Sequence, residues 1–141
     1  MTTNPRPRGG EPEIVTLRAA AGADSKQKLP LFFGVSDRSV GAKGLSMYKV
    51  VIPPGAAAEP HRHKDFETAI YVLKGQVETR YGPGLAQSVV NGPGDFVFIP
   101  PDLPHQPRNL SDQEPAEAIV ARNDPSEQEN VVPYDPAAET A

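Results

Sequence analysis

Residues 55–75 read GAAAEPHRHKDFETAIYVLKG, and this stretch decides the fold. It places His61 and His63 directly after a turn with glycine and proline, and just before an apolar, β-branched run at 68–73. In a β-strand, residues i and i+2 point to the same face of the sheet, so the two imidazoles lie on one side. Imidazole nitrogens that converge in this way are typical metal ligands. The stretch therefore predicts a short strand whose two histidines are either metal ligands or, as is common for H-x-H alone, surface or hydrogen-bonded residues.

Outside this stretch, short apolar runs alternate with turn residues. The runs predict strands at 46–52, 68–73, 76–81, 88–90, 96–99 and 116–122. The alanine and glutamate residues of the last run also permit a helix. Seventeen prolines and twelve glycines are hard to place inside helices but suit many short strands joined by turns. The expected fold class is therefore all-β, a sandwich or a barrel.

The length and the composition predict one soluble domain with two tails. A chain of 141 residues, 38% hydrophobic and 23% charged, can form one core and has little room for a second. Residues 1–12 are polar and rich in proline and glycine, which predicts a flexible arm. We expect the barrel domain at 13–123 and an acidic, proline-containing tail at 124–141. The apolar residues at 131–134 of this tail are candidates for docking on the domain.

Several classes of function are excluded or disfavoured by composition. Because the chain has no cysteine, disulfides, zinc–thiolate sites, iron–sulfur clusters and cysteine nucleophiles are excluded. No window approaches the roughly 18 consecutive apolar residues of a membrane span, and the N-terminus lacks the apolar segment of a signal peptide. We therefore expect a cytoplasmic protein without a membrane partner. The net charge of −4 and the scattered lysines and arginines argue against nucleic-acid binding.

The chain has three histidines, and each lies beside proline or glycine turns. His105 follows the strand expected at 96–99, and a neighbouring strand would bring it to the same centre as His61 and His63. Glu67 follows His63 by four residues and offers an oxygen ligand. Three neutral imidazoles and one carboxylate suit one divalent ion per chain, namely Fe, Mn, Ni, Co or Zn. We expect no organic cofactor.

These residues resemble the two signature motifs of the cupin superfamily. The first motif, G-x5-H-x-H, then three or four residues, E, six residues and G, corresponds to Gly55, His61, His63, Glu67 and Gly75. Seven residues instead of six separate Glu67 from Gly75. The second motif, G-x5-P-x-G-x2-H-x3-N, corresponds to Gly94, Pro100, His105 and Asn109, with Asp102 in place of its second glycine. The resemblance covers about residues 40–122.

The resemblance implies a double-stranded β-helix, a barrel of two antiparallel sheets with the metal inside near one mouth. It also implies that His61, His63, Glu67 and His105 are the metal ligands. If Glu67 points inward, strand alternation also brings Tyr71 inward. Tyr71 is then the candidate catalytic side chain, and Tyr71 and Phe98 are the candidates for contact with substrate. Packing in the core is the competing interpretation for both side chains.

The leading hypothesis for function is a metal-dependent enzyme, a dioxygenase-type oxidoreductase that acts on a small organic molecule. The alternatives are a metal-dependent isomerase or lyase, and a cupin that binds a small ligand without catalysis. We also expect a homodimer, because exposed sheet edges of small barrels often pair.

Overall fold

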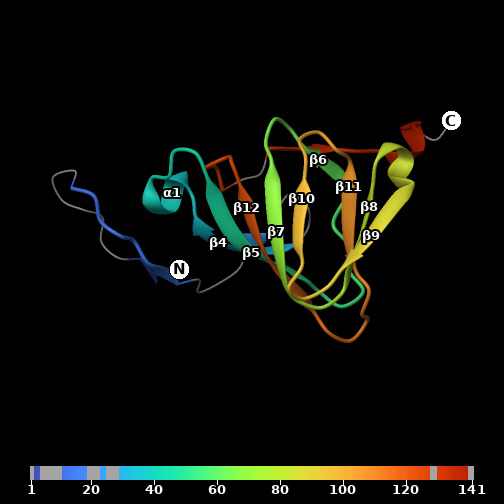
Figure 1. Ribbon diagram of the computed structural model, residues 1–141, viewed down its shortest axis with the longest axis horizontal. Coiled ribbons are helices and arrows are strands. Elements are labelled where there is room, and N and C mark those ends of the chain that lie inside the picture. The colour runs from blue at the N-terminus through green and yellow to red at the C-terminus, as the bar shows by residue number, and fades with distance from the viewer. Residues whose placement is uncertain (1, 4–10, 19–22, 25–28, 128–129, 140–141) are drawn as a thin grey trace.

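Two antiparallel sheets face each other across the core (Figure 1). A computed structural model describes residues 2–3, 11–18, 23–24, 29–127 and 130–139. Its strands are β1 (Thr2–Thr3), β2 (Leu17–Arg18), β3 (Ala23–Asp24), β4 (Pro30–Val35), β5 (Ser46–Ile52), β6 (His61–His63), β7 (Thr68–Lys74), β8 (Val77–Tyr81), β9 (Gln87–Asn91), β10 (Phe96–Ile99), β11 (His105–Asn109), β12 (Ala116–Arg122) and β13 (Val131–Pro133). The helices are short: α1 (Asp37–Val40), η2 (Pro83–Leu85) and η3 (Pro136–Glu139). The predicted all-β, double-stranded β-helix class is confirmed.

The larger sheet has the strand order β10-β7-β12-β5-β4-β3, and the smaller one has the order β13-β6-β11-β8-β9. A separate pair joins β1 and β2. The runs expected to form strands all do so, and the run at 116–122 is a strand and not a helix. In β12 buried and half-buried residues alternate along its whole length, which is the pattern of a strand with one face on the core.

The inward faces of three neighbouring strands build one wall of the barrel. Ile52 of β5 lies opposite Ala116 of β12, and Tyr48 lies opposite Val120. On the other side of β12, Val120 lies opposite Ile70 of β7. Buried apolar side chains form two clusters, one around Ile52 and Ala116 and one around Tyr48 and Val120. These clusters form the hydrophobic core among the described residues.

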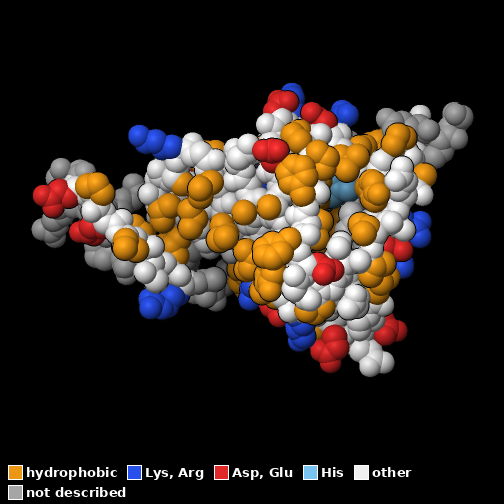
Figure 2. All heavy atoms as spheres, viewed as in Figure 1, with side chains coloured by type: hydrophobic (Ala, Val, Ile, Leu, Met, Phe, Trp, Pro, Cys, Tyr) orange, Lys and Arg blue, Asp and Glu red, His pale blue; other side chains and the backbone are white. Residues whose placement is uncertain are grey.

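The outer face of the larger sheet is also apolar, and packing of Phe98 in the core, the competing interpretation from the sequence, is wrong. Phe96 and Phe98 of β10 are 84% and 59% exposed, whereas Ile99 is buried. Phe96 lies opposite Tyr71 of β7, and the two rings contact each other with centroids 4.8 Å apart. Figure 2 shows hydrophobic side chains gathered over β7 and β10. The β10 strand is apolar on both faces, so its sequence alone does not indicate which face is buried.

The C-terminal segment adds a strand to the smaller sheet. In β13, Val131 lies opposite His63 and Pro133 lies opposite His61. The Tyr134 hydroxyl accepts a hydrogen bond of 2.8 Å from the Gly84 N–H. The apolar part of the tail therefore docks on the strand that carries two of the histidines. Most of the arm expected at 1–12 lies outside the described residues. Among the described helices, none has the length and apolar character to cross a bilayer.

Candidate metal centre

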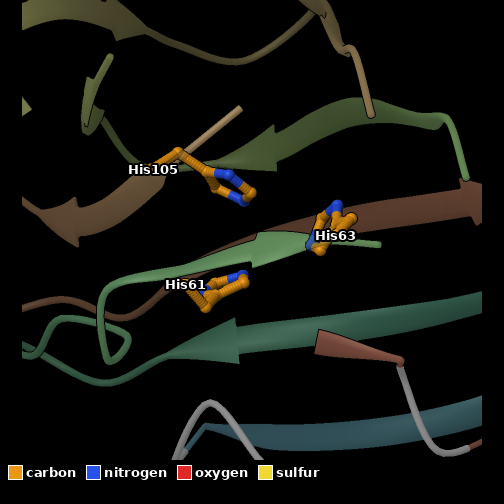
Figure 3. Close-up of side chains that lie close together, drawn as sticks. All are labelled: His61, His63 and His105. Atoms are coloured by element: carbon orange, nitrogen blue, oxygen red, sulfur yellow. The ribbon is translucent and has the colours of Figure 1, made fainter. Parts of the chain in front are cut away.

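The three histidines come together from two neighbouring strands of the smaller sheet. His61 and His63 are the inward residues of β6, and β11 pairs with β6 so that His105 lies directly opposite His61. Figure 3 shows the three imidazoles turned toward one common space. Their ring centroids are 4.4 to 5.1 Å apart, and one nitrogen from each ring lies within 4.8 Å of the others. Side chains 44 positions apart in the sequence thus form one candidate metal-binding group.

Hydrogen bonds on the far side of each ring orient the imidazoles. Nδ1 of His61 lies 2.6 Å from the Glu59 carbonyl, and Nδ1 of His105 lies 2.9 Å from the Leu103 carbonyl. A carbonyl only accepts hydrogen bonds, so both Nδ1 atoms carry the proton and both Nε2 atoms keep a lone pair. Hydrogen bonds of this kind fix the tautomer and the ring orientation of metal-binding histidines. The arrangement therefore favours metal binding through Nε2.

Burial keeps two of the three imidazoles neutral. Burial, with smaller contributions from the positive charges of His105, His61 and Arg122, lowers the pKa of His63 to about 2. Burial also lowers the pKa of His61, and this effect outweighs the opposite effect of the hydrogen bond to Glu59. Near pH 7 both rings are therefore neutral, which is the form that binds metal.

The residues present fit a metal ion of the kind that the resemblance implies. Nε2 of His61 is buried and has no hydrogen-bond partner among the described residues. Such a group is costly to bury unless a ligand or an ion satisfies it. A transition metal ion would accept the lone pair of this nitrogen and would take its other nitrogen ligands from His63 and His105.

Thr68, and not Glu67, occupies the inward position next to the histidines. Glu67 is exposed and does not belong to the candidate metal-binding group. Thr68 is 1% exposed, and its Oγ1 lies 2.9 Å from Nδ1 of His63, which links the two sheets. Six residues separate Thr68 from Gly75, the spacing that the family motif gives to its glutamate. Glu67 is one residue further from Gly75 than the motif requires. Because side chains alternate along a strand, this extra residue indicates that the Glu67 side chain lies on the face opposite to that of Thr68.

The same alternation places the other candidates outside the barrel. Tyr71 and Phe98 lie on the outer face of the larger sheet, where they border a shallow apolar groove and do not line the interior cavity. The inward orientation expected for Tyr71 is thus wrong, because it depended on an inward Glu67. Two other motif residues support the loops around the site. Asp102, which stands where the motif has a glycine, adopts a left-handed conformation (φ 64°) that glycine adopts readily. The Asn109 amide donates to the carbonyls of Ile52 and Glu114.

A cavity of about 80 Å³ adjoins the histidines. His61, His63, His105 and Thr68 line one part of it, and most of the other walls are apolar. An apolar cavity of about 150 Å³ holds benzene, so this space holds a few non-hydrogen atoms. In Figure 2, histidine atoms are visible at the surface near β11, which indicates a route to the site from solvent.

Comparison with known proteins places the chain in one fold family. A family model described as "Cupin domain" matches residues 48–122. The germin-like protein subfamily T member 3 of Arabidopsis thaliana is 40% identical over 72 residues. That match covers 48% of this chain and only 30% of the plant protein, so the chain spans under a third of this curated relative.

Solved structures share the fold at low sequence identity. The polyketide cyclase RemF of Streptomyces resistomycificus superposes with a TM-score of 0.65 at 22% identity, over 84% of this chain and 80% of that one. The oxalate decarboxylase of Bacillus subtilis gives a TM-score of 0.67 at 20% identity, over 81% of this chain and 29% of that one. The decarboxylase has Mn(II) centres.

Proposed function

Because the chain belongs to the cupin domain family, we propose that it binds one divalent transition metal ion through His61, His63 and His105 and acts as a metal-dependent enzyme on a small organic molecule. The observation that carries the proposal is the convergence of three buried imidazoles, two of them held by carbonyls with Nε2 directed into the group. Thr68 holds the third ring from the opposite sheet. This is a pre-organised set of nitrogen ligands.

The reaction class that fits best is a dioxygenase-type oxidation. A bound divalent ion supplies Lewis-acid polarisation and, as iron or manganese, redox chemistry with dioxygen. Among the described residues that line the cavity there is no aspartate, glutamate or lysine, and every lining histidine belongs to the candidate metal-binding group. Reactions that require a protein side chain as a strong general base are therefore disfavoured. The apolar walls exclude water and leave space for a small substrate.

A lyase, isomerase or cyclase reaction without redox change is the second candidate. The group contains no carboxylate among the described residues, so the metal would keep its full positive charge and polarise a bound oxygen strongly. The structural likeness to a polyketide cyclase, which extends over most of both chains, is in line with this class.

The test is oxygen uptake by protein loaded with Fe(II) or Mn(II), measured with catechol, thiol and diketone substrates. The dioxygenase proposal predicts substrate-dependent oxygen consumption that His61→Ala abolishes. Product formation without oxygen uptake would identify the second candidate. Stoichiometric ligand binding without any product would instead indicate a binding protein. The homodimer and the cytoplasmic location stay predictions.

A further inference from the structure

The outer face of the larger sheet is apolar across four neighbouring strands, β10, β7, β12 and β5. The strand register aligns the outward side chains in two rows that cross the sheet. One row consists of Phe98, Ala69, Ala121 and Met47, and the other consists of Phe96, Tyr71, Ile119 and Lys49. We call the seven apolar residues of these rows the outer apolar face. The solvent side of an antiparallel sheet is usually polar, so this face indicates contact with another molecule.

The outer apolar face combines a ridge with a hollow. Phe96 and Phe98 project from the edge strand β10 and are 84% and 59% exposed. Ala69 and Ala121 have small side chains in the middle of their row, and they line a groove of about 320 Å³ between larger residues. A cavity of about 150 Å³ holds benzene, so the groove has room for an aromatic ring. The ridge and the hollow thus lie side by side on one surface.

The centre of the outer apolar face carries no charge, and charged groups lie at its border. All the residues that line the groove are apolar. Lys49 ends one row, and its Nζ lies 3.3 Å from a carboxylate oxygen of Glu117 on the neighbouring strand. Glu67, which is exposed, precedes the outward residues of β7. An apolar centre with a polar rim is typical of protein interfaces, and this one matches a partner whose own centre is uncharged.

The exposed area is of the size that a stable dimer needs. Met47, Tyr71, Phe96 and Phe98 are 46%, 38%, 84% and 59% exposed. A large apolar side chain offers roughly 200 Å² when it is fully exposed, so these four contribute on the order of 500 Å². A standard interface buries about 800 Å² on each partner. The four side chains alone supply more than half of this area, and the remaining residues of the face and its rim add to it.

We propose that the outer apolar face is the interface of a homodimer, in which two copies of the chain pack face to face about a two-fold axis. Such an axis brings the same surface of both copies together, so that the ridge of each copy meets the hollow of the other. The contact is then made by the face of the sheet and not by its edge. The inference is independent of the metal centre, because none of the seven residues lines the interior cavity.

Analytical ultracentrifugation of the metal-free protein from about 1 to about 100 µM measures the dimerisation constant. We expect the wild type to reach the mass of two chains within this range. Phe96→Glu should raise the dissociation constant about a hundredfold or more, because a two-fold interface contains this position twice and each carboxylate would be desolvated. Since Phe96 is 84% exposed, the variant should keep its fold, which circular dichroism checks. Phe96→Ser, which adds no charge, should raise the constant about tenfold or more.

Leu110→Glu is the matched control, because it places the same charge on an apolar residue that is 44% exposed and follows β11 of the smaller sheet. It should leave the dissociation constant within about twofold of wild type. The wild-type measurement does not depend on the variants, and a wild type that stays monomeric over the whole range would refute the proposal. A dimer that persists in both Phe96 variants, or that only Leu110→Glu dissociates, would also refute it.

Discussion

Acidification should destabilise the metal-free protein through His63. Burial lowers the pKa of this side chain to about 2, compared with 6.5 for an exposed histidine. Between these two values the unfolded chain binds more protons than the folded one, so the stabilising contribution is complete above pH 6.5 and is lost as the pH falls. Integration from pH 7.5 to pH 5 gives a loss of about 2 kcal/mol from this one residue. His61, whose pKa is also lowered, adds a loss of the same sign.

Urea unfolding of metal-free protein at pH 7.5, 6.5, 5.5 and 5.0 measures this effect. With a urea m-value of about 2 kcal/mol/M, the loss at pH 5 from His63 lowers the unfolding midpoint by about 1 M. His63→Gln is the control, because it removes the titrating group while the carboxylates that also titrate in this range remain. The wild-type stability should therefore fall more steeply with pH than that of the variant. Equal slopes for the two proteins, or a wild-type stability that rises on acidification, would refute the reasoning.

Two further predictions concern the supports of the site. Thr68→Val should weaken metal affinity by about tenfold or more, because His63 loses its hydrogen bond from the opposite sheet. Glu67→Ala should leave the metal affinity unchanged. A metal titration of both variants measures the two affinities. Asn109→Ala should lower the free energy of unfolding by about 3 kcal/mol, because the buried amide donates to several carbonyls across two loops. Denaturant unfolding measures this loss in the Asn109→Ala variant, and a change in the free energy of unfolding below about 1 kcal/mol would contradict the prediction.

The sequence predicts the strands and the three histidines well, because both depend on local patterns. The strand at 46–52 has the predicted bounds, and His61 and His63 share a face as their spacing requires. The Asp102 backbone adopts a left-handed conformation, which explains why the motif has a glycine at this position. Turn residues and period-two alternation therefore carry most of the information about this fold.

The fourth inward residue was predicted to be Glu67, and the structure places Thr68 there instead, because a shift of a single residue changes the face of a strand. The motif tolerates three or four residues after His63, and only the distance to Gly75 distinguishes Glu67 from Thr68. The structure resolves the choice through burial: Phe66 packs on His63, Glu67 turns outward and Thr68 turns inward. The orientation of Tyr71 follows from the same choice.

Other features depend on packing between segments that are distant in the sequence. Phe96 and Phe98 alternate with Val97 and Ile99, and both pairs are apolar, so nothing in the strand itself indicates its outer face. The inward position of Arg122, in contrast to the outward position of Phe98, follows from the sequence pattern of its own strand. Arg122 continues the inward alternation of Ala116, Ala118 and Val120. A fully buried arginine is uncommon, and period-two alternation can reveal its inward position from the sequence.

The most direct test of the central claim is metal analysis of protein purified without chelators, with His105→Ala and Glu67→Ala beside it. The account predicts one equivalent of a divalent transition metal in the wild type and in Glu67→Ala, and a loss of that metal in His105→Ala. Absence of metal from all three proteins after reconstitution, or loss of metal in Glu67→Ala with retention in His105→Ala, would contradict a centre built from His61, His63 and His105.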